Sequence, residues 1–278
     1  MSPRSSAYIV SNELELHVSE WGDPSSPFVM MWHGLARTGR DFDEIAEALS
    51  DRYFVACPDT VGRGLSSWMK SDDDYSMALY GDTVMAVVDH YGPATLRWVG
   101  TSMGGLIGIR MAAEALKGRI THLVINDIGP EIPEAARRRI ADYVGNPPEH
   151  DTVKEMGEWL RTSYAPFGDN PESFWNRLVD TSVRRTDSGR LTAHYDPAIA
   201  AQFIQHPDDF DTWPQYDAVE AKTLLVRGAD SDVLAKPVAE EMLRRGPKPR
   251  FVEFPDIGHA PTFVAQDQQD LLREFLAS

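Results

Sequence analysis

One serine of this chain lies in a setting that suits nucleophilic chemistry. Ser102 is the centre of Gly100-Thr101-Ser102-Met103-Gly104, with a strand-like apolar run before it and a helix-like apolar stretch after it. A sharp turn between a strand and a helix holds a serine hydroxyl out at the end of a sheet. Small residues two positions before and two positions after it let neighbouring backbone come close. The pattern predicts a serine that attacks a carbonyl carbon.

Such a serine needs a base that takes its proton, and a carboxylate that orients the base. His259 is the best placed histidine, because it follows Gly258 in a turn after the last strand-like run. We therefore predict His259 as the general base. Other histidines fit strands, a helix or an inserted segment: His17, His90, His122, His150, His194 and His206.

Three aspartates could orient this base. Asp230 and Asp232 follow the strand-like run Thr223–Val226 and lie two positions apart, so only one of them is expected to face the imidazole. We favour Asp232, with Asp230 as the alternative acid. Asp127 is a third option, directly after a strand-like run, although Asn126-Asp127 fits better as the start of the inserted segment.

The negative oxygen formed by attack on a carbonyl needs hydrogen-bond donors aimed at it. The backbone amide of Met103 is one candidate, because it lies at the start of the helix after the nucleophile. The amide of Leu35 is the second, in the loop His33-Gly34-Leu35 after an apolar run. His33 itself is expected to be structural, with a supporting role behind the site as the alternative.

The elements that must position these residues alternate between strand-like and helix-like stretches. The strand-like runs are Ala7–Val10, Leu14–Glu20, Phe28–Trp32, Tyr53–Ala56, Leu96–Val99, His122–Asn126, Thr223–Val226 and Phe251–Phe254. The helix-like stretches between and after them are Asp41–Leu49, Leu79–Tyr91, Gly105–Leu116, Pro237–Arg245 and Gln266–Leu276. Alternation of this kind predicts an α/β fold with a mostly parallel sheet covered by helices on both faces.

The alternation breaks between residues 130 and 221. This segment carries little strand signal and many aromatic residues, and its expected helices are Glu134–Val144, Thr152–Tyr164, Pro171–Arg185 and Pro197–His206. We therefore expect a core made of residues 1–129 and 222–278, with residues 130–221 inserted as a helical cap. The cap aromatics are expected to form the core of the cap or to line an apolar pocket.

Composition limits the possible partners. The chain has 278 residues and a formal net charge of −16, which argues against nucleic acids and anionic membrane surfaces as partners. Its apolar runs are shorter than a membrane span, and the amino terminus does not resemble a signal peptide. We therefore expect a cytoplasmic monomer or homodimer that acts on a small molecule.

The cysteine content predicts neither a disulfide nor a zinc site. Cys57 is the single cysteine, so no internal disulfide can form, and we expect it to be a small buried side chain. No cysteines and histidines have the spacing of zinc ligands. Neither a metal nor an organic cofactor is expected.

Over nearly its whole length the chain resembles the α/β-hydrolase superfamily, and in particular its capped, esterase-like members. The resemblance rests on the oxyanion loop His33-Gly34, the glycine loop Asp59–Ser66, the nucleophile elbow Gly100–Gly104 and the chain order Ser102, Asp232, His259. Asp59 would tie down the glycine loop, with a substrate contact as the alternative. The acid loop departs from the family's Gly-x-x-Asp form, but a Ser-Asp pair followed by a leucine is a familiar variant and favours Asp232.

The resemblance implies acyl transfer through an acyl-enzyme on Ser102, and thus a carboxylesterase or lactonase for small to medium apolar esters. Related members with a similar triad cleave carbon–carbon bonds or act as cofactor-free perhydrolases. A carbon–carbon hydrolase would need cations for a dienoate, and Arg184, Arg185 or Arg190 could supply them. Dehalogenases and epoxide hydrolases are disfavoured, because they carry Asp where this chain has Ser102. A non-catalytic ligand receptor on the same scaffold is the alternative outside enzymes.

Overall fold

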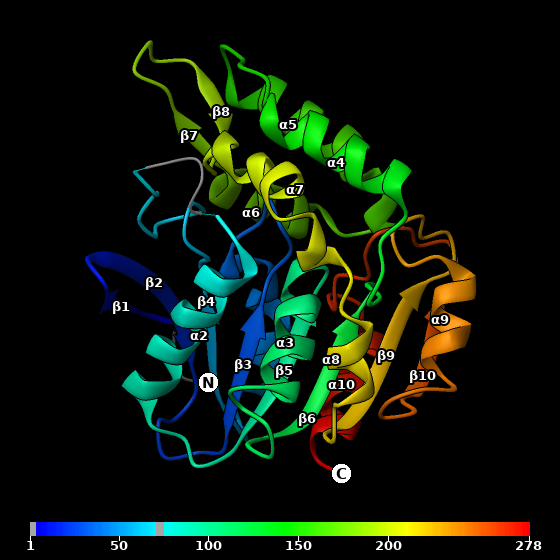
Figure 1. Cartoon of the computed structure of the whole chain (residues 1–278). Coiled ribbons are helices and arrows are strands. Elements are labelled where there is room, and N and C mark those ends of the chain that lie inside the picture. The colour runs from blue at the N-terminus through cyan, green and yellow to red at the C-terminus, as the bar shows by residue number, and fades with distance from the viewer. Residues whose placement is uncertain (1–3, 71–74) are drawn as a thin grey trace.

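The computed structural model describes residues 4–70 and 75–278, in which one eight-stranded sheet forms the centre of the molecule (Figure 1). Neighbouring strands are parallel except for the pairs β1–β2 and β2–β4, so the expected mostly parallel sheet is confirmed. In spatial order the strands are β1 (Ser5–Ser11), β2 (Leu14–Trp21), β4 (Phe54–Pro58), β3 (Phe28–Trp32), β5 (Leu96–Thr101), β6 (Ile120–Asn126), β9 (Lys222–Gly228) and β10 (Arg250–Phe254).

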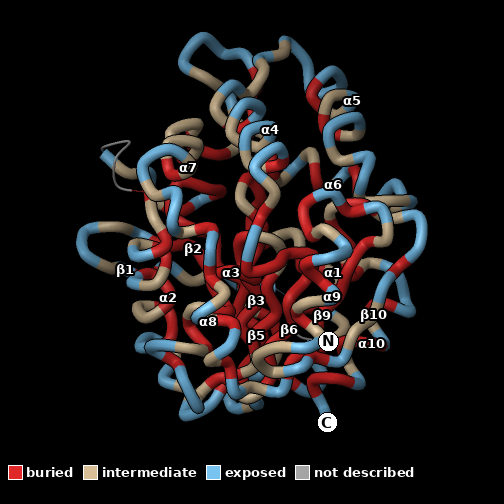
Figure 2. The backbone as a smooth tube through the Cα atoms, turned by 45° about the vertical axis from the view of Figure 1, so that its right-hand side comes forward, coloured by how far each residue is buried: buried red, intermediate tan, exposed pale blue. Residues whose placement is uncertain are grey.

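The central strands are continuous apolar runs because both of their faces are covered. Side chains alternate between the faces of a strand, and in β3 Met30 and Trp32 enter one core cluster while Val29 and Met31 enter the other. Trp32 stacks on Trp98 of β5 with 5.6 Å between ring centroids. Figure 2 shows these strands as a buried centre within a more exposed shell.

Helices cover both faces of the sheet, as the alternation of elements predicts. One core cluster contains side chains of α2 (Met77–Tyr91), α3 (Met103–Ala113), α8 (Trp213–Asp217) and α9 (Lys236–Met242). The other contains side chains of α1 (Asp43–Leu49) and α10 (Gln266–Leu276). Helix α2 begins where the Ser76 side chain accepts from the Leu79 amide and ends at Gly92, which has a φ of 62°.

The inserted segment lies over the carboxyl ends of the parallel strands, at the top of Figure 1. Its elements are α4 (Glu134–Gly145), α5 (Val153–Ser163), α6 (Glu172–Ser182), β7 (Val183–Arg185), β8 (Leu191–Ala193) and α7 (Gln202–Gln205). At its base, Glu131 pairs with Asp211, and the Thr212 amide donates to the Pro130 carbonyl over 2.7 Å. The chain thus returns to the core at residues 211–212, earlier than 221, and α8 packs against α3.

Two expected cap helices differ in the structure. Helix α6 ends at Ser182, and residues 183–185 pair with 191–193 as a short antiparallel hairpin. The turn of this hairpin runs from Thr186 to Arg190 and contains Gly189 with a φ of 84°, a conformation that favours glycine. The stretch expected as a helix from Pro197 to His206 is a 3₁₀ turn followed by the single-turn helix α7.

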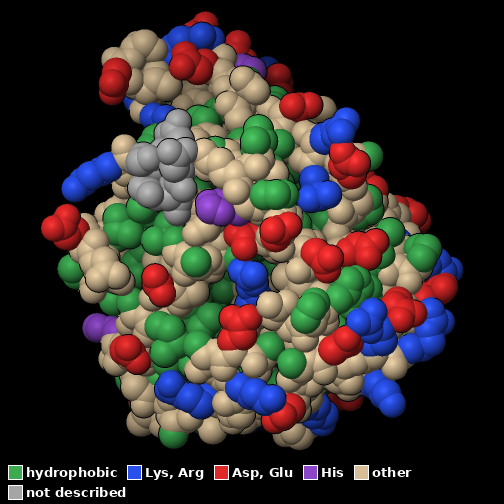
Figure 3. Space-filling model, in the orientation of Figure 1, with side chains coloured by type: hydrophobic (Ala, Val, Ile, Leu, Met, Phe, Trp, Pro, Cys, Tyr) green, Lys and Arg blue, Asp and Glu red, His purple; other side chains and the backbone are tan. Residues whose placement is uncertain are grey.

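Other features of the described residues bear on the expected partners. No helix in residues 4–70 or 75–278 is long and apolar enough to cross a membrane. Cys57 is buried, as expected. On the face shown in Figure 3, acidic and basic side chains are interspersed, on a chain whose formal net charge is −16.

Candidate active site

Ser102 lies at the sharp turn between β5 and α3. Its φ of 53° and ψ of −118° are unusual for a residue other than glycine. A Cβ atom on Gly100 would lie 2.2 Å from the Gly104 carbonyl oxygen, and one on Gly104 would lie 2.0 Å from the Trp32 carbonyl oxygen. Both glycines are therefore required by close backbone contacts, which is the role expected from the sequence.

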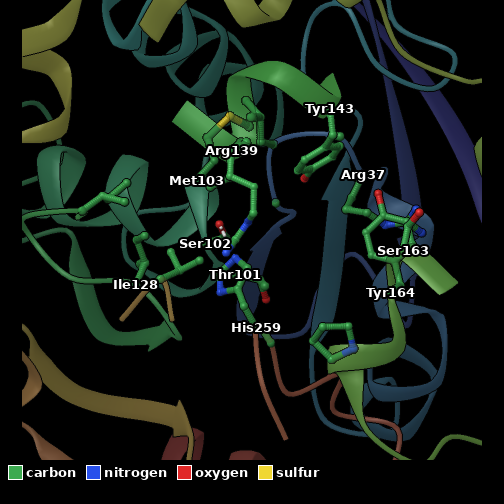
Figure 4. Close-up of a pocket in the computed structure, with 18 of the residues that line it drawn as sticks. Arg37, Thr101, Ser102, Met103, Ile128, Arg139, Tyr143, Ser163, Tyr164 and His259 are labelled. Atoms are coloured by element: carbon green, nitrogen blue, oxygen red, sulfur yellow. Dashed lines mark hydrogen bonds between the residues drawn. The ribbon is translucent and has the colours of Figure 1, made fainter. Parts of the chain in front are cut away.

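His259 faces this serine from the loop after β10. Its Nε2 lies 2.9 Å from the Ser102 Oγ, and Figure 4 shows the two residues side by side at the cavity. Two contacts hold the histidine loop: the Asn126 side-chain amide donates to the Pro261 carbonyl over 2.8 Å, and the Gly258 amide donates to the Pro166 carbonyl of the cap over 2.7 Å. The loop is thus fixed from both the core and the cap.

The carboxylate beside His259 belongs to Asp127, not to Asp232. Asp127 Oδ2 lies 2.8 Å from the His259 Nδ1, and the Asp127 side chain is fully buried. The same carboxylate accepts from the Gly228 amide over 2.9 Å and from the Ser231 hydroxyl over 2.6 Å. These partners hold it in one orientation, with the imidazole between Asp127 and Ser102.

The expectation for Asp232 is therefore corrected. The loop after β9 turns Ser231 inward, toward Asp127, whereas its neighbours Asp230 and Asp232 are exposed. Asp232 forms an ion pair with Arg139 of α4, and this hydrogen bond is the main cause that lowers the pKa of the Asp232 carboxyl. Asp230 and Asp232 both line the cavity, but neither is the hydrogen-bond partner of the imidazole.

A signal for Asp127 was present in the sequence. It follows β6 directly, and β6 is the neighbour of β5, the strand that leads into Ser102. The chain order serine, aspartate, histidine is the same whether the acid is Asp127 or Asp232, so order alone could not choose between them. The φ of Asp127 is 56°, a conformation that aspartate and asparagine adopt more readily than most residues.

The two residues whose amides are the oxyanion-hole candidates, Leu35 and Met103, line the same cavity as Ser102. Met103 is the first residue of α3, where an amide has no partner within the helix. The Gly34 carbonyl accepts from the His33 Nδ1 over 2.7 Å and from the Arg37 amide over 3.2 Å. A trans peptide points its N–H away from its carbonyl, so the Leu35 amide lies on the side opposite to these donors.

His33 is a buried structural residue, as expected. Its Nε2 accepts from the Thr60 amide over 2.9 Å, which leaves the proton on Nδ1 for the Gly34 carbonyl. Burial lowers the pKa of His33 to about 4 against an ordinary value of 6.5. The neutral ring therefore fixes the loop that leads to Leu35.

Asp59 fixes the glycine loop after β4. Its carboxylate accepts from the Leu65 amide over 3.0 Å and from the Gly39 amide over 2.7 Å, and it pairs with His17. A Cβ atom on Gly64 would lie 2.3 Å from this carboxylate. Asp59 is 2% exposed, as suits the structural role expected for it.

A cavity of about 710 Å³ opens beside Ser102 and His259, between the core and the cap. Its lining is mainly apolar and comes from both parts of the chain, including Leu106, Ile128, Ile132, Ile140, Trp159, Phe167, Phe203 and Phe210. Figure 4 shows Arg139 and Tyr143 of α4 on one side and Arg37 and Tyr164 on another. Arg37 is paired with Asp41, and Arg139 with Asp232, so each of these cations has a carboxylate partner.

The three arginines considered for a dienoate lie elsewhere. Arg184 packs over the Trp68 ring, Arg185 donates to the Gly189 carbonyl, and Arg190 pairs with Asp151. All three belong to the β7–β8 hairpin region and are absent from the cavity lining. Within residues 4–70 and 75–278, no group of three His, Cys, Asp or Glu side chains could hold a metal ion.

Comparisons with known proteins agree with this fold. Residues 27–266 match the sequence profile described as the alpha/beta hydrolase fold. The chain is 38% identical over 266 residues to a 3-hydroxybutyrate-oligomer hydrolase of Cupriavidus necator, covering 92% of this chain and 90% of that protein. It is 28% identical over 263 residues to an esterase of Mycobacterium tuberculosis, covering 92% and 83% respectively.

A solved structure has the same fold as this chain. A crystal structure of an alpha/beta hydrolase from Novosphingobium aromaticivorans superposes with a TM-score of 0.88 and 32% identity, covering 100% of this chain and 99% of that one. The match spans both the sheet and the inserted cap. With the sheet order, the serine turn and the profile match taken together, the chain belongs to the alpha/beta hydrolase fold family.

Proposed function

We propose that this protein is a serine hydrolase that cleaves carboxylic esters, with Ser102 as nucleophile, His259 as general base and Asp127 as the acid that orients the base. The observation that carries the proposal is the continuous hydrogen-bonded chain from the Ser102 Oγ through the imidazole to the Asp127 carboxylate, at 2.9 Å and 2.8 Å. This is the geometry that activates a serine for acyl transfer.

The first half of the reaction forms an acyl-enzyme. Ser102 Oγ bonds to the ester carbonyl carbon while its proton moves to the His259 Nε2, and the carbonyl oxygen becomes an oxyanion. The Leu35 and Met103 amides donate to this oxyanion. When the carbon–oxygen bond of the ester breaks, His259 returns the proton to the departing alkoxide, and Asp127 stabilises the imidazolium throughout.

The second half releases the acid. Water attacks the acyl carbon and gives a proton to the His259 Nε2, and Ser102 regains a proton as it leaves. The Gly228 amide and the Ser231 hydroxyl donate to the oxygens of the Asp127 carboxylate. These two donors also prevent the carboxylate from turning away from the imidazole.

The cavity supports small to medium, largely apolar ester substrates. Its volume of about 710 Å³ lies within the usual range for small-molecule sites, and most of its lining is apolar. The Cupriavidus necator relative is named as a hydrolase of 3-hydroxybutyrate oligomers, whose units are joined by carboxylic esters. We therefore propose simple apolar esters, lactones and short hydroxyacid oligomers as the substrate classes to compare.

The experiment is a substrate panel with the wild type and Ser102→Ala. It contains p-nitrophenyl esters of increasing acyl length, lactones, 3-hydroxybutyrate dimers and trimers, and a dienoate ketone as a carbon–carbon substrate. We expect turnover of one or more ester classes that Ser102→Ala abolishes. Turnover of the dienoate ketone alone, or ester turnover that survives in Ser102→Ala, would contradict the proposal.

A further inference from the structure

Arg63 is a fully buried cation directly behind the two residues whose amides face the proposed oxyanion. It lies between the two glycines, Gly62 and Gly64, of the glycine loop Asp59–Ser66 and has 0% exposure. Its Nε donates to the Leu35 carbonyl over 2.8 Å, and its Nη2 lies 3.5 Å from the Met103 sulfur. Arg63 is absent from the cavity lining, so a substrate would meet Leu35 and Met103 and not the guanidinium.

The two peptide groups around Leu35 are therefore fixed from different sides. The Gly34 carbonyl is held by the His33 ring, and the Leu35 carbonyl is held by Arg63. With both carbonyls fixed, the Leu35 amide between them has little freedom to rotate. The contact with the Met103 side chain links the same guanidinium to the start of α3, where the second amide lies.

Arg63 forms no ion pair with a carboxylate of the described residues, 4–70 and 75–278. Its Nη1 donates instead to the Val61 carbonyl and to the Tyr80 hydroxyl. Its guanidinium also lies over the rings of Tyr75 and Tyr80, at 5.7 Å and 5.0 Å from their centroids. Burial raises the pKa of Tyr80, so its hydroxyl stays neutral and adds no negative charge.

We propose that Arg63 is a positioning residue for the oxyanion hole, which holds the Leu35 and Met103 amides toward one point and adds a buried positive charge behind them. This inference rests on the proposed ester hydrolysis. A buried cation without a counter-ion is costly for folding. Here its field stabilises a negatively charged transition state more than a neutral ester, because the surrounding protein screens it weakly.

The test compares Arg63→Met, Arg63→Lys and Tyr80→Phe with a matched control. Arg97→Met serves as the control, because Arg97 also donates to a carbonyl and lies over a tyrosine ring but is at the opposite end of β5 from Ser102. We expect kcat for an ester to fall about 100-fold in Arg63→Met and about 10-fold in Arg63→Lys, with KM within about threefold. Tyr80→Phe should cost a few-fold, and the control should match the wild type.

A ligand pair separates positioning from a purely structural effect. A trifluoromethyl ketone adds to Ser102 and forms an oxyanion, whereas the matching methyl ketone stays neutral in the cavity. Arg63→Met should lose affinity for the trifluoromethyl ketone in proportion to its loss in kcat/KM, and keep its affinity for the methyl ketone. The pKa of the adduct oxyanion, followed by ¹³C NMR at the labelled carbonyl carbon, should rise in this variant.

Different results of these measurements would overturn the role of Arg63 or the proposed function itself. A folded Arg63→Met protein with kcat within threefold of the wild type, or with equal losses of affinity for both ketones, overturns it. If Arg63→Met does not fold, Arg63→Lys is judged by the same two measurements, and a Tyr80→Phe protein with no loss of kcat also overturns the proposal. If the wild type shows no Ser102-dependent turnover of any ester, the proposed function itself fails, and this result is distinct from active enzyme that tolerates the loss of Arg63.

Discussion

Replacing Asp127 by asparagine separates the two candidate acids most sharply. In the wild type the carboxylate accepts from three donors: the His259 ring at 2.8 Å, the Ser231 hydroxyl at 2.6 Å and the Gly228 amide at 2.9 Å. Asparagine has nearly the same shape and can still accept from Gly228. Its amino group, however, would face the His259 Nδ1 and would donate where the carboxylate accepts.

The ring would then carry its proton on Nε2, directed at Ser102, and could not act as a base. A change of this kind in a serine–histidine–aspartate site lowers kcat by about 10⁴-fold, equivalent to about 5.5 kcal/mol in activation free energy. For Asp127→Asn we expect a loss of about 10³- to 10⁴-fold in kcat with little change in KM. The thermal unfolding temperature should fall only slightly, because asparagine fills nearly the same space as aspartate.

Asp232→Asn is the matched control. The Asp232–Arg139 pair is about half exposed on both sides, at 54% and 55%, and exposed ion pairs contribute little to stability. We expect kcat within about threefold of the wild type, with any change confined to KM, because Arg139 lines the cavity. Steady-state kinetics of both variants on one activated ester decides the matter, and a greater loss in Asp232→Asn than in Asp127→Asn would refute the assignment.

The remaining predictions concern packing, pH and positioning. Gly104→Ala should lower the free energy of unfolding in urea by at least about 3 kcal/mol, because its Cβ would lie 2.0 Å from a carbonyl oxygen of β3, whereas Gly81→Ala in α2 should not destabilise. Folded His33 binds its proton more weakly than the unfolded chain does, so the free energy of unfolding should decrease as the pH falls from about 6.5 to about 4. The decrease should reach about 3 kcal/mol and should be smaller in His33→Gln. If the free energy of unfolding of that variant depends on pH as in the wild type, His33 is not the cause. Asn126→Leu removes the hydrogen bond to the Pro261 carbonyl, so kcat should fall about 10²-fold at constant KM as the histidine loop shifts; unchanged kcat would exclude this role.

Local sequence patterns predicted most of the fold because they report burial directly. Each of the eight strand-like runs corresponds to a strand of the sheet. The central strands are apolar along their whole length because both of their faces are buried. The turn at Ser102 was predictable from a local pattern too: Gly100 is required by its contact with the Gly104 carbonyl, in the same short segment, whereas Gly104 is required by a contact with β3. The β7–β8 hairpin was missed because its strands are only three residues long.

The acid could not be chosen from the sequence because the choice depends on the direction in which two loops turn. Asp127 and Asp232 both follow strands that end at the same edge of the sheet. Which carboxylate reaches the imidazole is decided by the left-handed conformation of Asp127 and by Ser231, whose hydroxyl points inward to that carboxylate. Neither the backbone conformation of Asp127 nor the direction of the Ser231 hydroxyl can be predicted from the spacing of apolar residues. The role proposed for Arg63 likewise depends on contacts between segments far apart in the chain.

The central claim is that Ser102, activated by His259 and Asp127, is the nucleophile, and peptide mapping after reaction with a fluorophosphonate tests it most directly. The wild-type protein should gain one phosphonyl group per chain, located by mass spectrometry on the peptide that contains Ser102. Under the same conditions Asp127→Asn should react far more slowly, and Asp232→Asn should react at close to the wild-type rate. A folded wild-type protein that stays unlabelled, or an adduct on a different residue, would contradict the claim.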